Sequence, residues 1–222
     1  MYKIEVIFIL GLLNIGFERN AMIKTIIFDI GGVLIGYNWL DFLTQLFDGD
    51  EELAKKLKAH IFKNWAEVDR GVLSDEELID LFSKDAPELR PQIEYFWEHV
   101  GEALWQFDFT KDWLKELKAR GYQLLYLSNW SKHVRDCAEK QLDFLPLMDG
   151  GVFSYKVKLI KPDHAIYQEI VKKYNLIPEE CVFLDDKLEN CEAARECGLH
   201  AVQVVDHNHD IALAGLEALL EK

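Results

Sequence analysis

The stretch TIIFDIGGVLIGYNW, residues 25–39, decides how this chain folds. Its first residues are apolar and mostly β-branched, which is typical of a parallel strand buried on both faces. The run ends at a single aspartate, Asp29, and the pair Gly31-Gly32 follows almost at once. A lone carboxylate at the tip of a buried strand, next to a turn that lets other groups approach the backbone, marks a candidate site.

The rest of the chain alternates between strand and helix patterns. Further strands are predicted at residues 122–128, near 152–154, at 181–186 and at 200–205. Helical periodicity lies between them, at residues 110–120, 132–142, 162–174 and 188–198. This alternation predicts an α/β fold with a doubly wound, Rossmann-like parallel sheet.

Residues 39–105 interrupt this alternation. They carry apolar residues at three- and four-residue spacing and show no strand signal, and Ser74 with Glu77 forms a capping-box sequence. We expect a small helical bundle here, inserted into a core that is made of residues 22–38 and 106–222.

Residues 1–21 contain the apolar run YKIEVIFILGLLNIG, which resembles a signal-peptide core. The run is too short to span a bilayer, and no cleavage-site pattern follows it. Because Met22 directly precedes the first strand, we interpret residues 1–21 as an extension from an upstream start. An extra strand or helix and a targeting signal are the alternatives.

Charge and cysteine usage narrow the class of protein. The chain has 222 residues and a net charge of −14, which argues against a nucleic-acid partner. Its four cysteines form no C-x-x-C pair, so they are expected to be reduced thiols in the cytoplasm. We expect no membrane association, and either a monomer or a homodimer.

Polar residues stand at the carboxyl ends of the predicted strands or just beyond them: Asp29, Ser128-Asn129, Lys161 and Asp185-Asp186. In open α/β sheets, ligands bind at this edge. The order and spacing of the four positions together favour one shared site.

The acids of this set predict a Mg²⁺ site. Adjacent carboxylates such as Asp185 and Asp186 repel each other unless a cation or a proton lies between them. Asp29 and Asp186 can bind the ion directly, and Asp185 directly or through water. The Gly31 carbonyl is a further ligand, and Gly31 and Gly32 let the backbone come close to a phosphoryl group.

The same set suits phosphoryl transfer. The Asp29 carboxylate is a competent nucleophile toward phosphorus and would form an aspartyl-phosphate. Ser128, the neighbouring Asn129 amide and Lys161 would hold the phosphoryl oxygens and neutralise the charge that develops there.

Four segments of this chain resemble the motifs of the haloacid dehalogenase superfamily: FDIGGVL, YLSNW, KLIKPDHAIYQ and VFLDDKLENCEAARECGL. They are most similar to the subfamily with a helical cap after the first motif. The resemblance covers residues 23–205. It implies Asp29 as nucleophile, Ser128 and Lys161 as phosphate clamps, Asp185-Asp186 as the metal motif, and residues 39–105 as a cap that selects the substrate.

Gly31 departs from the D-x-D pattern of the family's phosphatases, in which the second acid protonates the leaving oxygen. One interpretation is a Mg²⁺-dependent phosphatase for a small phosphorylated metabolite with a good leaving group, since the motif resembles that of D-x-G sugar-phosphate phosphatases. A metal-free 2-haloacid dehalogenase is the alternative, although the acid pair argues against it. Phosphonate cleavage and a catalytically silent metal- and phosphate-binding protein are further alternatives.

Several other side chains are candidates for substrate contacts. Asp69 could substitute for the missing acid and Arg70 could contact the substrate, although an Asp-Arg pair at a helix end is the plainer interpretation. Tyr37, Asn38 and Trp39 lie where the insert begins, and one of them could face the pocket. Asn190 could orient a metal-bound water. His207 and His209 suggest a metal tract, but a surface turn explains them as well.

Overall fold

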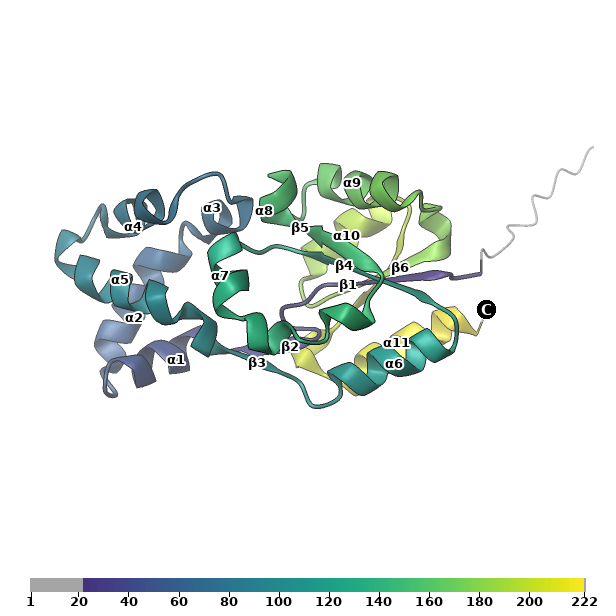
Figure 1. Cartoon of the computed structure of the whole chain (residues 1–222), viewed down its shortest axis with the longest axis horizontal. Coiled ribbons are helices and arrows are strands. Elements are labelled where there is room, and N and C mark those ends of the chain that lie inside the picture. Colours follow the sequence, from purple (N-terminus) through teal and green to yellow (C-terminus); the bar gives the residue numbers. More distant parts are fainter. Residues whose placement is uncertain (1–21, 222) are drawn as a thin grey trace, which may run out of the picture.

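A five-stranded sheet forms the centre of the protein, whose computed structural model describes residues 22–221 (Figure 1). The interpretation of residues 1–21 therefore falls outside the described residues. In spatial order the strands are β5 (Gly150–Phe153), β4 (Gln123–Ser128), β1 (Thr25–Phe28), β6 (Cys181–Asp185) and β7 (His200–Gln203). All four pairings are parallel, which confirms the predicted sheet.

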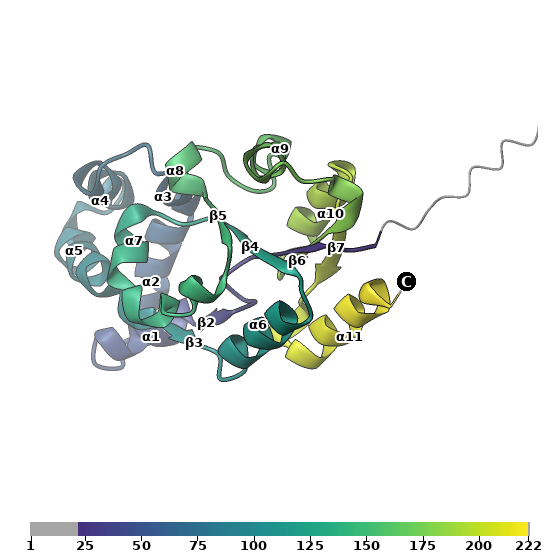
Figure 2. The same cartoon turned by 45° about the vertical axis from the view of Figure 1, so that its right-hand side comes forward.

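Helices cover both faces of the sheet (Figure 2). One face packs on α9 (His164–Tyr174) and α10 (Leu188–Glu196), and the other on α6 (Thr110–Ala119) and α11 (His209–Leu220). Successive residues of β1 alternate between the two: Ile27 belongs to the first cluster, and Ile26 to the second. Both side chains are fully buried, which explains why the strand is apolar without interruption.

A helical bundle lies beyond the carboxyl ends of these strands (Figure 1). It contains α1 (Trp39–Leu46), α2 (Glu51–Phe62), α3 (Trp65–Arg70), α4 (Asp75–Ser83) and α5 (Arg90–His99). The predicted capping box is present: the Ser74 hydroxyl accepts from the Glu77 N–H, and the Glu77 carboxylate accepts from the Ser74 N–H at 2.8 Å. We call this bundle the cap.

Two short strands join the core to the cap, and the sequence analysis did not predict them. β2 (Ile35–Tyr37) leaves the core and pairs antiparallel with β3 (Leu104–Gln106), which returns to it. A Cβ on Gly36 would lie 2.3 Å from the Trp105 ring, so only glycine lets the two segments approach this closely. Segments of three residues are too short to show a strand period.

Smaller differences concern the helix starts. Thr110 could have capped α6 but is its first residue, and its buried hydroxyl donates to the Leu34 carbonyl at 2.6 Å. The helix predicted at 132–142 is α7 (Lys132–Cys137), followed by a 3₁₀ turn at Glu139–Leu142. Asp163 caps α9, one residue after the proline expected to open it.

The remaining elements are short. They are α8 (Ser154–Val157) and the 3₁₀ turns Pro87–Leu89, Val100–Ala103, Leu145–Leu147, Pro178–Glu180 and Val205–His207. Within residues 22–221, none of the helices has the length and apolar character needed to cross a membrane.

Candidate active site

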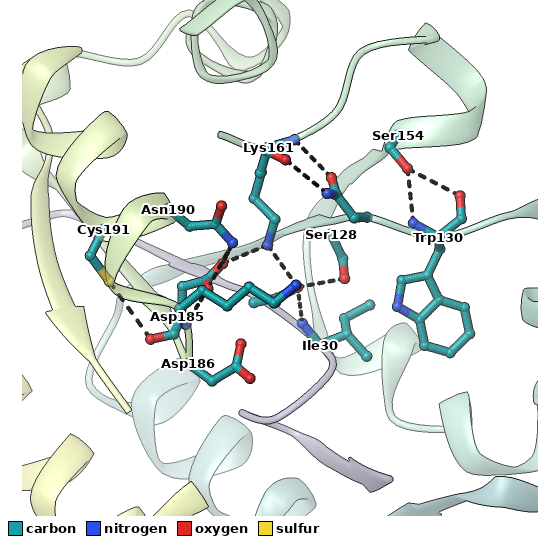
Figure 3. A network of polar contacts seen from close by, with 12 residues as sticks. Ile30, Ser128, Trp130, Ser154, Lys161, Asp185, Asp186, Asn190 and Cys191 are labelled. Carbon is teal, nitrogen blue, oxygen red and sulfur yellow. Dashed lines mark hydrogen bonds and ion pairs between the residues drawn. The ribbon is translucent and has the colours of Figure 1, made fainter. Parts of the chain in front are cut away.

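Asp29 lies at the end of β1 and is almost fully buried. Its Oδ1 accepts from the Ile30 N–H at 2.8 Å and from the Ser128 hydroxyl at 2.5 Å, and the Lys161 ammonium lies 2.9 Å from the same oxygen (Figure 3). These three donors come from the ends of two adjacent strands and from the segment before α9. They fix the orientation of the carboxylate, so the structure brings together three residues that the sequence predicted to share a site.

Lys161 is only 4% exposed and bridges two acids. Its Nζ lies 2.6 Å from Asp185 Oδ2 as well as 2.9 Å from Asp29 Oδ1. Burial lowers the pKa of Lys161, but the two carboxylates outweigh burial and raise the pKa to about 12. The ammonium is therefore charged at neutral pH.

Asn129 positions this lysine through its backbone. The Asn129 side chain donates to the Lys161 carbonyl at 3.1 Å and accepts from the Lys161 N–H at 2.9 Å. The side chain expected beside a phosphoryl group thus holds the segment that carries Lys161.

Asp185 and Asp186 are adjacent in sequence but have different surroundings. Each Asp185 oxygen accepts two hydrogen bonds: Oδ1 from the Lys187 N–H and Asn190, Oδ2 from Lys161 and Asn190, at 2.6–3.0 Å. Among the contacts of the described residues, the Asp186 carboxylate accepts only a long contact of 3.4 Å from the Tyr37 hydroxyl. Asn190, which the sequence left either near a metal-bound water or facing solvent, is buried and donates to Asp185 (Figure 3).

The acids of this site fit a hard divalent cation. One oxygen from each of Asp29, Asp185 and Asp186 lies within 4.8 Å of the others. Burial raises the pKa of Asp29 to about 7, with Asp185 and Asp186 adding to the rise and Lys161 opposing it. Burial and Asp185 also raise the pKa of Asp186. Three carboxylates therefore exceed the charge of one ammonium, and an oxygen-only ligand set is what Mg²⁺ prefers.

The two glycines of the first turn have different roles. Gly32 has φ of +77°, and a Cβ there would lie 2.7 Å from Asp186 Cγ. At Gly31 the Tyr37 ring lies 3.4 Å from the position of an added Cβ. The aromatic ring thus stands beside the place where family members of the D-x-D type carry their second acid.

Gly32→Ala is expected to lower stability and, with Asp186 as a ligand of Mg²⁺, to lower the affinity for the ion. Left-handed backbone alone costs an alanine about 1 kcal/mol, and here the methyl group also displaces Asp186. Displacing a ligand group typically lowers metal affinity about 10- to 100-fold. Thermal unfolding and the Mg²⁺ concentration that gives half-maximal turnover measure the two effects.

Gly121→Ala is the matched control, because Gly121 has φ of +91° with nothing within 4 Å of an added Cβ. It should show the backbone cost alone. If both variants lose the same stability and require the same Mg²⁺ concentration, glycine is needed at position 32 for the backbone of the turn and not to leave room for Asp186.

A cavity of about 360 Å³ lies between Asp29 and the cap. The cap side is aromatic: the rings of Phe62 and Trp65 stack at 4.6 Å between centroids, and Trp39 lies 5.1–5.2 Å from both. The ionisable residues that line the cavity are Asp29, Tyr37, Asp69, Lys161, Asp186 and Lys187. An aromatic wall above a polar floor suits a small ligand with a charged end and an uncharged body.

The cap contributes Asp69, at the end of α3, to this cavity. Asp69 and Arg70 do lie at a helix end, as the plainer interpretation expected, but Arg70 forms its ion pair with Glu67 at 3.8 Å. The Asp69 carbonyl accepts from the Ser154 hydroxyl at 2.5 Å, which ties α3 to α8 of the core. No sequence signal singled out Ser154, and Lys187 could have been found only because it directly follows the acid pair.

The histidines near the C-terminus do not form a metal cluster within the described part of the chain. His207 contacts the Gly32 carbonyl at 3.0 Å through Nδ1, and His209 stacks on Phe109 at 4.0 Å between centroids. His207 is exposed in the 3₁₀ turn Val205–His207, as the surface-turn interpretation expects, and His209 is half-buried at the start of α11.

Comparison with known proteins gives matches over most of the chain. A family model described as haloacid dehalogenase-like hydrolase matches residues 23–198. Drimenol cyclase drtB of Aspergillus calidoustus is 29% identical over 82% of this chain, which spans only 34% of that relative. D-ribitol-5-phosphate phosphatase of Bacteroides thetaiotaomicron is 30% identical over 82% of this chain and 92% of its own length.

Among solved structures, a HAD-family enzyme of Bacteroides thetaiotaomicron in complex with magnesium and inorganic phosphate has a TM-score of 0.65. It is 22% identical, and the alignment covers 82% of this chain and 93% of that one. This likeness shows a shared fold.

Proposed function

Because the chain belongs to the haloacid dehalogenase-like hydrolase family, we propose that it is a Mg²⁺-dependent phosphatase that hydrolyses a small phosphorylated metabolite through Asp29. The observation that carries this proposal is the convergence of Asp29, Ser128 and Lys161 beside Asp186, at the base of the cavity. The magnesium and phosphate complex of the structural neighbour supports the choice of ion and reaction.

The proposed metal ligands are Asp29, Asp186 and the Gly31 carbonyl. Asp185 is proposed to act indirectly, by holding Lys161 in position. Bound Mg²⁺ would supply positive charge where the anionic substrate and the acids meet. Lys161 and the Ser128 hydroxyl hold the Asp29 carboxylate ready, and they can also donate to phosphoryl oxygens. Attack by Asp29 releases the substrate oxygen and leaves an aspartyl-phosphate, which water then hydrolyses.

The cavity supports a substrate with one charged end. Among its lining residues the cations are Lys161 and Lys187, and two acids already neutralise Lys161. The stacked rings opposite can cover the uncharged face of a sugar or polyol. The name of the relative D-ribitol-5-phosphate phosphatase supports this class of substrate.

Metal removal tests the proposal. We expect EDTA to lower turnover of p-nitrophenyl phosphate and of sugar and polyol phosphates by about 10³-fold, because a metal contributes several kcal/mol to transition-state stabilisation. Excess Mg²⁺ should restore the rate. Halide release from a 2-haloacid that survives EDTA would instead support the dehalogenase, and binding of Mg²⁺ and phosphate without turnover would support a silent protein.

A further inference from the structure

We propose that Asp69 of the cap is the proton donor and acceptor of the reaction, in place of the acid that is missing at Gly31. This inference rests on the proposed function and adds a catalytic residue to it. The first turn offers no carboxylate for the purpose beyond Asp29, so a side chain that donates the proton would have to stand on another wall of the cavity.

Asp69 has the position that this role requires. It lines the cavity together with Asp29, but belongs to the cap, at the last turn of α3. It stands outside the group of three acids whose oxygens lie within 4.8 Å of one another, so it is separate from the proposed metal ligands. A substrate bound to Asp29 would place its leaving oxygen between the two walls.

The segment that carries Asp69 is fixed to the core. Ser154 donates to the Asp69 carbonyl at 2.5 Å, and the Lys158 ammonium donates to the Gly71 carbonyl. Gly71 also lies too close to Tyr155 for a side chain, since an added Cβ would be 2.6 Å from Tyr155 Cβ. These contacts hold the end of α3 at one place above the cavity.

The charges around Asp69 suit proton exchange near neutral pH. Burial raises the pKa of Asp69 to about 7 and Asp29 adds to the rise, whereas Lys187 and Lys161 lower it. Within α3 the nearest charges, Arg70 and Glu67, pair with each other, and from the turn after α8 Lys158 faces the Gly71 carbonyl. An acid with a pKa near the working pH is the most efficient general acid–base catalyst.

Tyr37 is the competing donor, because its ring lies beside Gly31 and its hydroxyl is 3.4 Å from Asp186. Burial, Asp186 and Asp29 raise the pKa of Tyr37 above its usual value. The phenol therefore holds its proton more tightly than an ordinary tyrosine, which leaves Asp69 as the better acid.

The proposed steps conserve protons and electron pairs. Asp29 attacks phosphorus, the bond from phosphorus to the leaving oxygen breaks, and that oxygen takes the proton of the Asp69 carboxylic acid. The Asp69 carboxylate then accepts a proton from the water that attacks the aspartyl-phosphate. The bond between phosphorus and Asp29 breaks, its electron pair returns to Asp29, and Asp69 is again protonated.

The test compares Asp69→Asn with the wild type on two kinds of ester. For the most rapidly hydrolysed alkyl phosphate, whose alkoxide needs a proton, kcat/KM should fall about 10²- to 10⁴-fold. For p-nitrophenyl phosphate, whose leaving group needs none, kcat/KM should change little. The variant should instead release a burst of p-nitrophenol, because the aspartyl-phosphate accumulates when water lacks its base.

Glu67→Gln, in the same helix α3, is the control and should match the wild type. Unfolding temperatures report whether Asp69→Asn keeps its fold. A second test uses the wild type alone. The ratio of alkyl to aryl kcat/KM should fall about tenfold per pH unit above pH ~7, because only the alkyl ester needs protonated Asp69. Titration of Asp29 affects both esters equally and cancels in the ratio.

The outcomes separate the two proposals. Asp69 is not the acid, although the protein is a phosphatase, if Asp69→Asn lowers kcat/KM equally for both esters and gives no burst. The same conclusion follows if the wild-type ratio of alkyl to aryl kcat/KM is constant with pH. If the wild type hydrolyses neither ester with Mg²⁺, the proposed function fails and this inference fails with it.

Discussion

Asp29→Asn is expected to lower kcat by at least about 10⁴-fold, because an amide cannot replace the carboxylate as nucleophile and loss of a nucleophile is among the largest single effects known in enzymes. The amide oxygen can still accept from Ser128 and Ile30, which contact Asp29 Oδ1 at 2.5 and 2.8 Å. The site should therefore keep its arrangement while it loses its chemistry. Steady-state turnover with saturating Mg²⁺, together with labelling by a radioactive phosphoryl group, measures this loss.

The same substitution should not destabilise the metal-free protein. Burial raises the pKa of Asp29 to about 7 from 3.8. A raised carboxyl pKa means that stability falls as pH rises from about 4 through 7, because the folded protein holds the proton more tightly than the unfolded chain. The neutral amide of the variant lacks this cost, so the variant's unfolding temperature at pH 8 should equal or exceed that of the wild type. A variant that is inactive and also much less stable would show a structural role instead.

Lys161→Met should destabilise the metal-free protein by about 3–5 kcal/mol at pH 8, which is the usual cost of removing one partner from a buried ion pair. The substitution leaves Asp29 and Asp185 without the ammonium that lies 2.9 and 2.6 Å away. Turnover should also be lost, because no cation then faces the transferring group from this side. Chemical denaturation at a series of pH values measures the stability.

The pH dependence of this effect has a definite sign. The raised pKa of Lys161, about 12, means that the wild-type lysine contributes stability at all pH values below its unfolded pKa of 10.5. In the variant Asp29 loses the ammonium that lowers its pKa, so its pKa should lie above the wild-type value of about 7. Asp29 then takes up a proton as pH falls, and the deficit should shrink toward pH 5. Lys115→Met, which removes an exposed partner of Asp112, should cost less than about 0.5 kcal/mol. A deficit of equal size at pH 5 and pH 8 would point to lost packing.

The buried strands and the polar residues at their carboxyl ends could be predicted from the sequence, because each leaves a local pattern in it. Strands buried on both faces leave continuous apolar runs, and the polar residues at their ends must meet at one edge of the sheet. For this reason Asp29, Ser128 and Lys161 were correctly placed together.

The remaining features depend on packing that a sequence does not contain. Asp185 and Asp186 look alike in the sequence, yet Asn190 and Lys161 reach only the first of them. Their difference arises from side chains 24 positions upstream and 5 downstream of Asp185. The position of Asp69 depends on the packing of the cap against α8. This contact joins residues far apart in the sequence and leaves no local sequence pattern.

The β2–β3 ribbon limits how the cap can move. The chain enters and leaves the cap through two strands that are paired with each other, so the cap is attached on one side, and its other side touches the core through α3 and α8 (Figures 1 and 2). A movement of the cap about this ribbon would have to break the α3–α8 contacts and the stacking of Trp97 on His133 of α7. With Asp69 as the proton donor that we propose, the same movement would carry the acid away from Asp29, so proton transfer would require these contacts to be intact.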